Sequence, residues 1–342
     1  MTARAFITGV SGLTLSEAER SFLRAARPWG FILFKRNIDT PAQVAALVAE
    51  FRSEVGAEAA VLVDQEGGRV QRLGPPHWPK YPPAARFGAL YELDRQAGLD
   101  AARIGARLIA ADLEALGITV DCLPLADVPA PEGDPVIGNR AYGVTPDKVS
   151  ALAAAAAEGL AAGGVLPVLK HLPGHGRAAC DSHLALPVVG CDRDTLEATD
   201  FAAFRPLAGQ PLGMTAHVVF SSIDPDRPAT LSQAMISDVI RTAIGFSGAL
   251  MSDDLSMGAL SGDLAWRTRA ALAAGCDLAL HCNGRLGEME QVAAESPELS
   301  GEAAARCAAA LAARKTPDGA DLAALREEFA ALLARLPAEV SS

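Results

Sequence analysis

The chain contains few aromatic residues and no run of basic residues. These two features limit the folds and the binding partners that the sequence is compatible with. Phe, Trp and Tyr account for 5% of the 342 residues, whereas 50% are hydrophobic. That balance suits many helices packed closely on strands. The formal net charge is -11 at pH 7, and no basic run is present to replace the counterions of nucleic acid or of an anionic membrane. We therefore expect neither of these as a general partner, although a local basic site is compatible with the composition.

Paired cysteine motifs are missing as well. The six cysteines are scattered and form no CxxC pair, which argues against both a disulfide framework and a zinc ribbon. We interpret them as reduced and mostly structural. They are Cys122, Cys180, Cys191, Cys276, Cys282 and Cys307.

The sequence also has no uninterrupted apolar stretch long enough to span a membrane. The most apolar segment, 151–169, contains Glu158, Gly163-Gly164 and Pro167. It is better interpreted as a helix that ends at glycine and is followed by a strand. The first twelve residues hold one Arg and a strand-like run broken by Gly, unlike a secretory signal. We expect a soluble, cytoplasmic protein.

Short apolar runs recur along the chain and alternate with helical patterns. Thr14, Thr40 and Thr145 are predicted N-caps, the last two followed directly by Pro. Strands that alternate with helices imply a parallel sheet, and eight is the number that closes it. The predicted fold is therefore α/β, a (β/α)8 barrel of the TIM type. The predicted strands are 5–9, 30–34, 60–63, 118–123, 165–169, 212–217, 248–251 and 276–280.

The pattern predicts a single domain over residues 1–342. The barrel should cover about 5–285, with a Pro-rich loop at 73–83 and a long helix near 93–116 in its wider third segment. Residues 286–336 are Ala-rich and helical in pattern. Because no linker interrupts the chain, we expect this tail to pack on the barrel rather than to form a second domain.

Polar residues gather directly after the apolar runs. Asp64 follows the third run, Lys170-His171 ends the fifth, and Asp253 ends the seventh. In a barrel these strand ends meet at one face, where active sites form. The richest stretch is KHLPGHGRAACDSH, residues 170–183, which places three histidines, a lysine and an aspartate in a loop of Gly, Pro and Ala.

Glycoside hydrolysis is the chemistry that these residues suit. It needs one group at the anomeric carbon and another that protonates the leaving oxygen. Asp253 is suited to be the nucleophile. His183 is suited to be acid and base, since a pKa of about 6.5 permits both near neutral pH. Asp181 could hold the imidazole in one tautomer, as the carboxylate of a serine-protease triad does.

Five motifs in consistent order resemble the β-N-acetylhexosaminidases of glycoside hydrolase family 3, the short single-barrel bacterial enzymes of peptidoglycan recycling. The resemblance covers about residues 5 to 285. The motifs are DQEGGRVQRL at 64–73, PVIGNRAYG at 135–143, KHLPGHG with DSH at 170–176 and 181–183, MTAH at 214–217, and SDDLSM at 252–257.

The resemblance implies a retaining exo-β-N-acetylglucosaminidase that acts on muropeptides bearing terminal N-acetylglucosamine. Asp253 would form the covalent intermediate, and His183 with Asp181 would be the acid/base dyad. No cofactor and no metal are implied, and we expect a monomer. The residues implied to bind N-acetylglucosamine are Asp64, Arg72, Arg140, Lys170 and His171.

Other interpretations stay open at this point. Asp253 and Asp254 could start a helix, where anions are favoured. His175 could only hold the loop together, and His217 could be a packed histidine. Glu66 could be paired with Arg69 or Arg72 beside the Gly67-Gly68 turn.

Two other classes of function are compatible with the same residues. Histidines and aspartates near strand ends could build the metal site of a barrel hydrolase, although Lys170 would repel the cation. A phosphorolytic or sugar-binding protein on the same scaffold is a further alternative. The composition of the 170–183 loop also predicts that it moves and orders over bound sugar.

Overall fold

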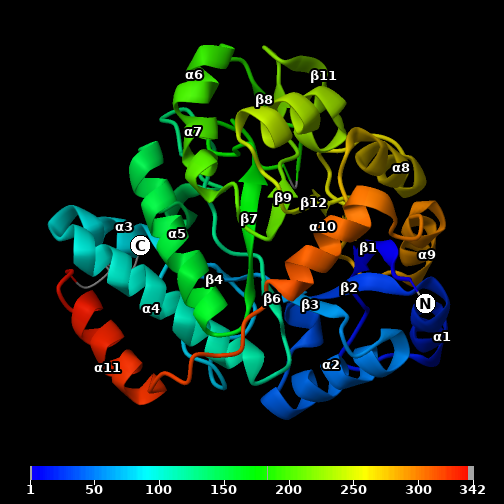
Figure 1. Ribbon diagram of the computed structural model, residues 1–342, viewed down its shortest axis with the longest axis horizontal. Helices are drawn as coiled ribbons and strands as arrows, with labels where there is room; N and C mark the ends of the chain where they lie inside the picture. Colours follow the sequence, from blue (N-terminus) through cyan, green and yellow to red (C-terminus); the bar gives the residue numbers. More distant parts are fainter. Residues whose placement is uncertain (1, 183, 338–342) are drawn as a thin grey trace.

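The core of the protein is a closed barrel of parallel strands (Figure 1), as predicted. The computed structural model describes residues 2–182 and 184–337. Neighbours in the ring follow chain order, and the last strand closes on the first, with Phe6 opposite Ala279. The eight barrel strands are β1 (Arg4–Thr8), β2 (Pro28–Leu33), β3 (Ala60–Val63), β6 (Val120–Asp121), β7 (Leu166–Leu172), β9 (Leu212–Thr215), β12 (Ala249–Asp254) and β13 (Leu278–His281). Every predicted strand overlaps one of them.

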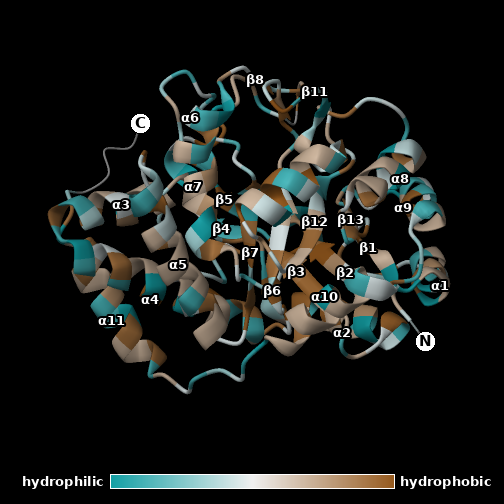
Figure 2. Cartoon of the chain, turned by 45° about the horizontal axis from the view of Figure 1, so that its top comes forward, coloured by the Kyte–Doolittle hydropathy of each residue, from teal (hydrophilic) through white to brown (hydrophobic). Residues whose placement is uncertain are grey.

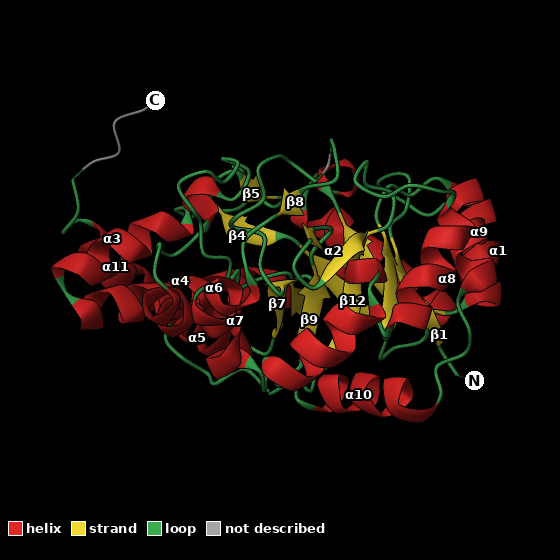
Figure 3. Ribbon diagram, turned by 90° about the horizontal axis from the view of Figure 1, so that it is seen from above, coloured by secondary structure: helices red, strands yellow, loops and turns green. Residues whose placement is uncertain are grey.

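Helices surround the barrel as an outer layer, visible in Figure 3 as helices flanking the strands. The connection from β3 to β6 holds two helices, and the second corresponds to the single helix predicted near 93–116. The helices of this layer are α1 (Glu17–Ala26), α2 (Pro41–Val55), α3 (Ala84–Leu93), α4 (Arg95–Glu114), α5 (Pro146–Ala162), α6 (Arg193–Ala198), α7 (Asp200–Phe204), the π-type helix η5 (Met235–Ala243), α8 (Leu264–Ala274) and α9 (Leu286–Glu295). Short 3-10 turns are η1 (Lys35–Asn37), η2 (Gly138–Arg140), η3 (Arg205–Leu207) and η4 (Ala229–Leu231).

Two of the three predicted N-caps are confirmed. Thr40 caps α2 and accepts a hydrogen bond from the backbone N–H of Gln43, and Thr145 stands at the N-cap of α5. For α1 the prediction of Thr14 is wrong, because Ser16 is the N-cap. Thr14 and Ser16 both have a glutamate three residues later, but the reciprocal capping box forms at Ser16. Its side chain accepts from the Glu19 N–H at 3.2 Å, and Glu19 accepts from the Ser16 N–H at 2.8 Å.

Apolar side chains fill both the barrel interior and the layer between strands and helices. Ile7, Leu62 and Val168 belong to the interior cluster. Strand residues of opposite parity, such as Phe31, instead pack under the helices, where Phe31 stacks on Phe51 of α2. Figure 2 shows this as brown strands at the centre and teal residues on outer helix faces. Within the described residues, no helix combines the length and apolar character needed to cross a membrane.

The C-terminal helices pack on the barrel. After α9, α10 (Gly301–Ala312) lies below the barrel in Figure 3, and its Cys307 and Ala310 join the interior cluster of the strands. Helix α11 (Leu322–Leu333) then lies beside α4. Phe329 of α11 packs on Phe87 of α3, with ring centroids 6.1 Å apart.

Two small sheets were not predicted. One is the hairpin of β4 (Gln65–Gly67) and β5 (Val70–Gln71), and the other joins β8 (Val188–Val189), β10 (Val219–Phe220) and β11 (Asp224–Pro228). Four of these five strands have two or three residues, too short to show an alternation of apolar and polar residues. The fifth, β11, has the sequence DPDRP, in which charged residues and proline give no strand pattern.

Candidate active site

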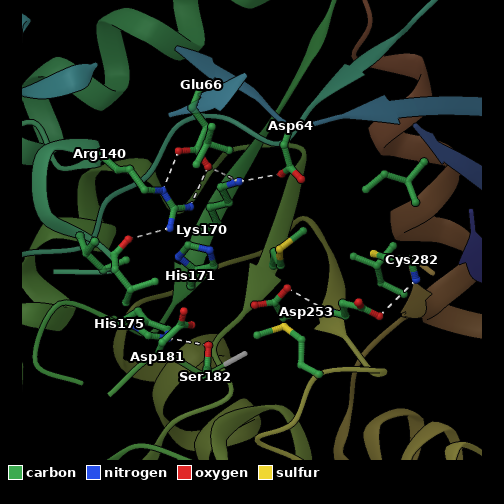
Figure 4. A pocket seen from close by; sticks show the side chains of 18 of the residues that line it. Asp64, Glu66, Arg140, Lys170, His171, His175, Asp181, Ser182, Asp253 and Cys282 are labelled. Atoms are coloured by element: carbon green, nitrogen blue, oxygen red, sulfur yellow. Dashed lines mark hydrogen bonds and ion pairs between the residues drawn. The ribbon is translucent and has the colours of Figure 1, made fainter. Parts of the chain in front are cut away.

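A pocket of about 280 Å³ opens where the barrel strands end, and it gathers the predicted site residues (Figure 4). Asp253 and Asp64 both line it, although they come from β12 and from the end of β3. His183 lies outside the described residues. The other predicted residues all line this one pocket: Asp64, Arg72, Arg140, Lys170, His171, Asp181 and Asp253.

Lys170 organises the charges on one wall of the pocket. It ends in an ammonium group that lies 3.0 Å from Asp64 Oδ1 and 2.7 Å from Glu66 Oε1, and its side chain is 2% exposed. Burial alone would lower the pKa of Lys170, but the two carboxylates raise it above its ordinary value. The lysine is therefore charged at any physiological pH.

Glu66 is paired with Arg140 and Lys170, so the predicted pairing with Arg69 or Arg72 is wrong. Arg140 donates from Nε and Nη2 to the two carboxylate oxygens, each at 2.8 Å. Burial would raise the pKa of Glu66, but the charges of Arg140 and Lys170 hold it at about 2. The tight turn at Gly67 and Gly68, both with positive φ, separates Glu66 from the side chains that follow it.

Arg72 and Asp64 form a second ion pair in the wall. Arg72 donates to Asp64 Oδ2 at 2.9 Å, and its guanidinium lies 5.1 Å from the centre of the Phe34 ring. Burial would raise the pKa of Asp64, but Lys170 and Arg72 hold it well below its usual range. Asp64 is thus an ionised acceptor beside two cationic groups, Lys170 and Arg72.

Asp127 orients two histidines of the pocket, His171 and His175. This wholly buried carboxylate contacts His171 Nδ1 at 2.7 Å and accepts from the backbone N–H of His175 at 2.7 Å. Because Nδ1 of His171 is engaged, Nε2 is the ring nitrogen left for a ligand. No motif in the sequence indicates this role for Asp127.

His175 holds the following loop, as the structural interpretation predicted, and it also lines the pocket. Its Nε2 lies 3.0 Å from Ser182 Oγ. Burial, reinforced by the neighbouring His171, lowers the pKa of His175 to about 4. The imidazole is therefore neutral at pH 7.

Asp253 and Asp254 stand at the end of β12, and neither starts a helix, so that interpretation is wrong for both. Helix α8 begins later, at Leu264, with Asp263 as its N-cap. Asp253 lines the pocket. Asp254 lines the pocket too, and its carboxylate accepts hydrogen bonds from Ser256 and from the N–H of Cys282, which fixes the chain beside Asp253.

His217 is a packed histidine. It is fully buried, with Nδ1 2.7 Å from Thr230 Oγ1 and Nε2 3.0 Å from the carbonyl oxygen of Asp254. Ser182 and Cys282 also line the pocket, although the sequence analysis assigned no role to Ser182 within the DSH motif and interpreted Cys282 as structural. Among the described residues, no group of three or more His, Cys, Asp or Glu side chains is arranged to hold a metal ion.

Comparison with known proteins agrees with this geometry. The family described as "Glycosyl hydrolase family 3 N terminal domain" matches residues 8–309. A beta-hexosaminidase of Aromatoleum aromaticum is 37% identical over 92% of this chain and 88% of its own, and one of Methylococcus capsulatus is 42% identical over 80% of both. The crystal structure of NagZ from Neisseria gonorrhoeae in complex with N-trifluoroacetyl-D-glucosamine has a TM-score of 0.87 at 31% identity and covers 98% of both chains. The chain therefore belongs to glycoside hydrolase family 3, among its β-N-acetylhexosaminidases.

Proposed function

We propose that the protein is a retaining exo-β-N-acetylglucosaminidase that removes terminal N-acetylglucosamine from peptidoglycan fragments. The observation that carries the proposal is that Asp253, Asp181 and the ion-paired residues around Lys170 all line one pocket. A pocket of about 280 Å³ suits one sugar ring, which favours action at a chain end. The relative from Neisseria gonorrhoeae, solved with an N-acylated glucosamine, supports the choice of sugar.

The charged wall is suited to hold the sugar. Asp64 can accept hydrogen bonds from hydroxyl groups, while Arg72 and Arg140 can donate to hydroxyl or amide oxygens. Lys170 and His171 complete this set. Because ion pairs hold these groups in fixed positions in the pocket, little reorganisation is needed when sugar binds.

Asp253 would attack the anomeric carbon. Its position on a barrel strand, next to the anchored Asp254, keeps the carboxylate in a fixed place. The new bond joins Asp253 Oδ to the anomeric carbon, while the glycosidic oxygen leaves and takes a proton. Water then cleaves the glycosyl ester, so that the β configuration is retained.

The proton would come from His183, with Asp181 stabilising the imidazolium. Asp181 lines the pocket, which supports its place in the dyad. His183 would afterwards act as base on the attacking water. The assignment of His183 stays a prediction, since that residue lies outside the described part of the chain.

The metal-dependent alternative is less well supported, because Lys170 places its ammonium group between Asp64 and Glu66, where these carboxylates would otherwise attract a cation. An unchanged rate in a chelator is the expected result. Phosphorolysis predicts that phosphate accelerates turnover and yields a sugar phosphate, whereas hydrolysis predicts no effect.

We also propose a cytoplasmic monomer. The six cysteines are unpaired in the structure, as suits a reducing compartment. Light scattering of the purified protein should give the mass of one chain, 35.3 kDa.

Trapping of the covalent intermediate tests the proposal. A slow fluorinated N-acetylglucosamine donor should leave a glycosyl adduct, and peptide mass spectrometry should map it to Asp253. An adduct on another residue would reassign the nucleophile. Release of sugar with inverted configuration would contradict the retaining mechanism.

A further inference from the structure

The loop that follows β7 has a rigid first part. Gly176 O accepts from the N–H of Ala130 at 3.1 Å, and Ala178 O accepts from Asp134 at 2.7 Å. Arg177 forms an ion pair of 2.6 Å with Asp200, a residue of α7 that is 1% exposed. These contacts fix residues 173–178 against two neighbouring segments of the barrel.

Between Cys180 and β8, the described residues 181–182 and 184–187 include several exposed side chains. Leu184 is 81% exposed and Leu186 37%. Apolar side chains at such exposure contribute little to holding a loop in place. Yet Asp181, in the same stretch, must have a fixed position if it is to orient a catalytic imidazole.

Ser182 is buried within this stretch, at 3% exposure. Its Oγ lies 3.0 Å from His175 Nε2, and its carbonyl oxygen accepts from the N–H of Ala259 at 3.1 Å. The side-chain contact reaches back to the rigid part of the loop, as Figure 4 shows beside Asp181. A neutral imidazole makes this hydrogen bond in either tautomer.

His175 is itself held firmly. Its backbone N–H donates to Asp127 at 2.7 Å, its ring packs edge-on against His171 with centroids 5.6 Å apart, and it is 4% exposed. A chain of fixed contacts thus runs from the wholly buried Asp127 through His175 to Ser182, the immediate neighbour of Asp181.

We propose that His175 and Ser182 form a positioning pair that sets Asp181, and with it the acid/base dyad, at the glycosidic oxygen. The inference rests on the proposed function, in which Asp181 belongs to that dyad. Neither His175 nor Ser182 transfers a proton to the substrate. Their hydrogen bond fixes where the proton is delivered.

The pair makes a specific kinetic prediction, because misplacing a general acid matters only when the leaving group needs a proton. In Ser182→Ala, kcat/KM should fall about tenfold or more for an alkyl N-acetylglucosaminide and no more than about twofold for the dinitrophenyl glycoside. Ser182→Thr, which retains the hydroxyl, should restore much of the loss. His175→Ala should show the same substrate dependence, and combining it with Ser182→Ala should add little further loss.

Two further variants separate the possible failures. Leu184→Ala changes an exposed side chain in the same stretch and should leave both rates unchanged. Asp181→Asn should show the strongest dependence on the leaving group. If Asp181→Asn lowers both rates equally, the dyad assignment fails and the inference fails with it. If Asp181→Asn behaves as expected but Ser182→Ala lowers both rates equally, or lowers neither, the positioning pair alone is refuted.

Discussion

At the scale of single residues, Lys170 shows how one buried charge organises a binding pocket. An unpaired ammonium at 2% exposure would be costly, but Asp64 and Glu66 both contact it. The sequence indicated Lys170 and Asp64, because each directly follows an apolar run. It could not indicate the partners of Glu66, since these depend on how the Gly67-Gly68 turn directs the hairpin of β4 and β5.

The Glu66 ion pairs predict a pH-dependent stability. The folded-state pKa of Glu66 is about 2, below its ordinary value of 4.5. The carboxylate therefore stabilises the fold fully above pH 4.5 and loses this effect as the pH falls toward 2. Glu66→Gln should lower the free energy of unfolding at pH 7 by an amount on the order of 3 kcal/mol. Urea unfolding of both proteins from pH 7 to pH 3 should show the difference shrinking only below about pH 4.5.

A surface carboxylate provides the control for that experiment. Glu92 pairs with Lys148 at 2.6 Å but is 69% exposed. Glu92→Gln should change stability by less than about 1 kcal/mol. A constant difference between wild type and Glu66→Gln down to pH 3 would contradict the assigned ion pairs.

The assignment of Asp253 as nucleophile predicts how its removal should change turnover. Asp253→Ala should lower kcat by about three orders of magnitude or more, because no carboxylate remains to form the intermediate. Calorimetric titration with N-acetylglucosamine should still detect binding, since the charged wall is untouched. Asp263→Ala removes a carboxylate from the N-cap of α8 and should leave kcat unchanged. Near-normal turnover by Asp253→Ala would show that the nucleophile lies elsewhere.

At the scale of elements, the barrel strands were predictable and the short sheets were not. A buried strand such as β7 appears as a run of apolar residues between glycines, and helices begin at recognisable caps such as Thr40-Pro41. The loop after β7 has no such signal. Its shape depends on contacts with residues distant in sequence, among them Asp200, and on backbone approaches that only glycine permits.

In this loop the closest of these backbone approaches is at Gly176. A Cβ there would stand 2.0 Å from the carbonyl oxygen of Val128, closer than any real contact. Gly176→Ala should therefore displace the rigid part of the loop, lower stability by about 1–3 kcal/mol and lower kcat about tenfold. Thermal unfolding and steady-state assays would measure both. Gly190→Ala is the matched control at the other end of the loop, since nothing lies within 4 Å of its Cβ, and equal behaviour of the two variants would contradict the explanation.

At the scale of the whole molecule, the active site and the C-terminal helices occupy different parts of the barrel. The pocket opens where the strands end, whereas α10 packs under the strands and α11 against α3 and α4. The sequence predicted that 286–336 would be helical and pack on the barrel. It could not predict that α11 would reach α4, because long-range packing leaves no mark on local periodicity.

This separation predicts that stability and catalysis can be changed independently. Phe329 of α11 is 9% exposed and contacts Phe87, and its ring lies where a side chain on Gly105 of α4 would stand. Phe329→Ala should lower the free energy of unfolding by about 3 kcal/mol through the cavity it leaves. At a temperature where the variant is fully folded, kcat and KM should match wild type, because the ring packs on Phe87 and Gly105, neither of which lines the pocket. Glu328→Ala, on the exposed side of the same helix, should change neither quantity. A fall in kcat for folded Phe329→Ala would mean that α11 is coupled to the pocket through α3 and α4.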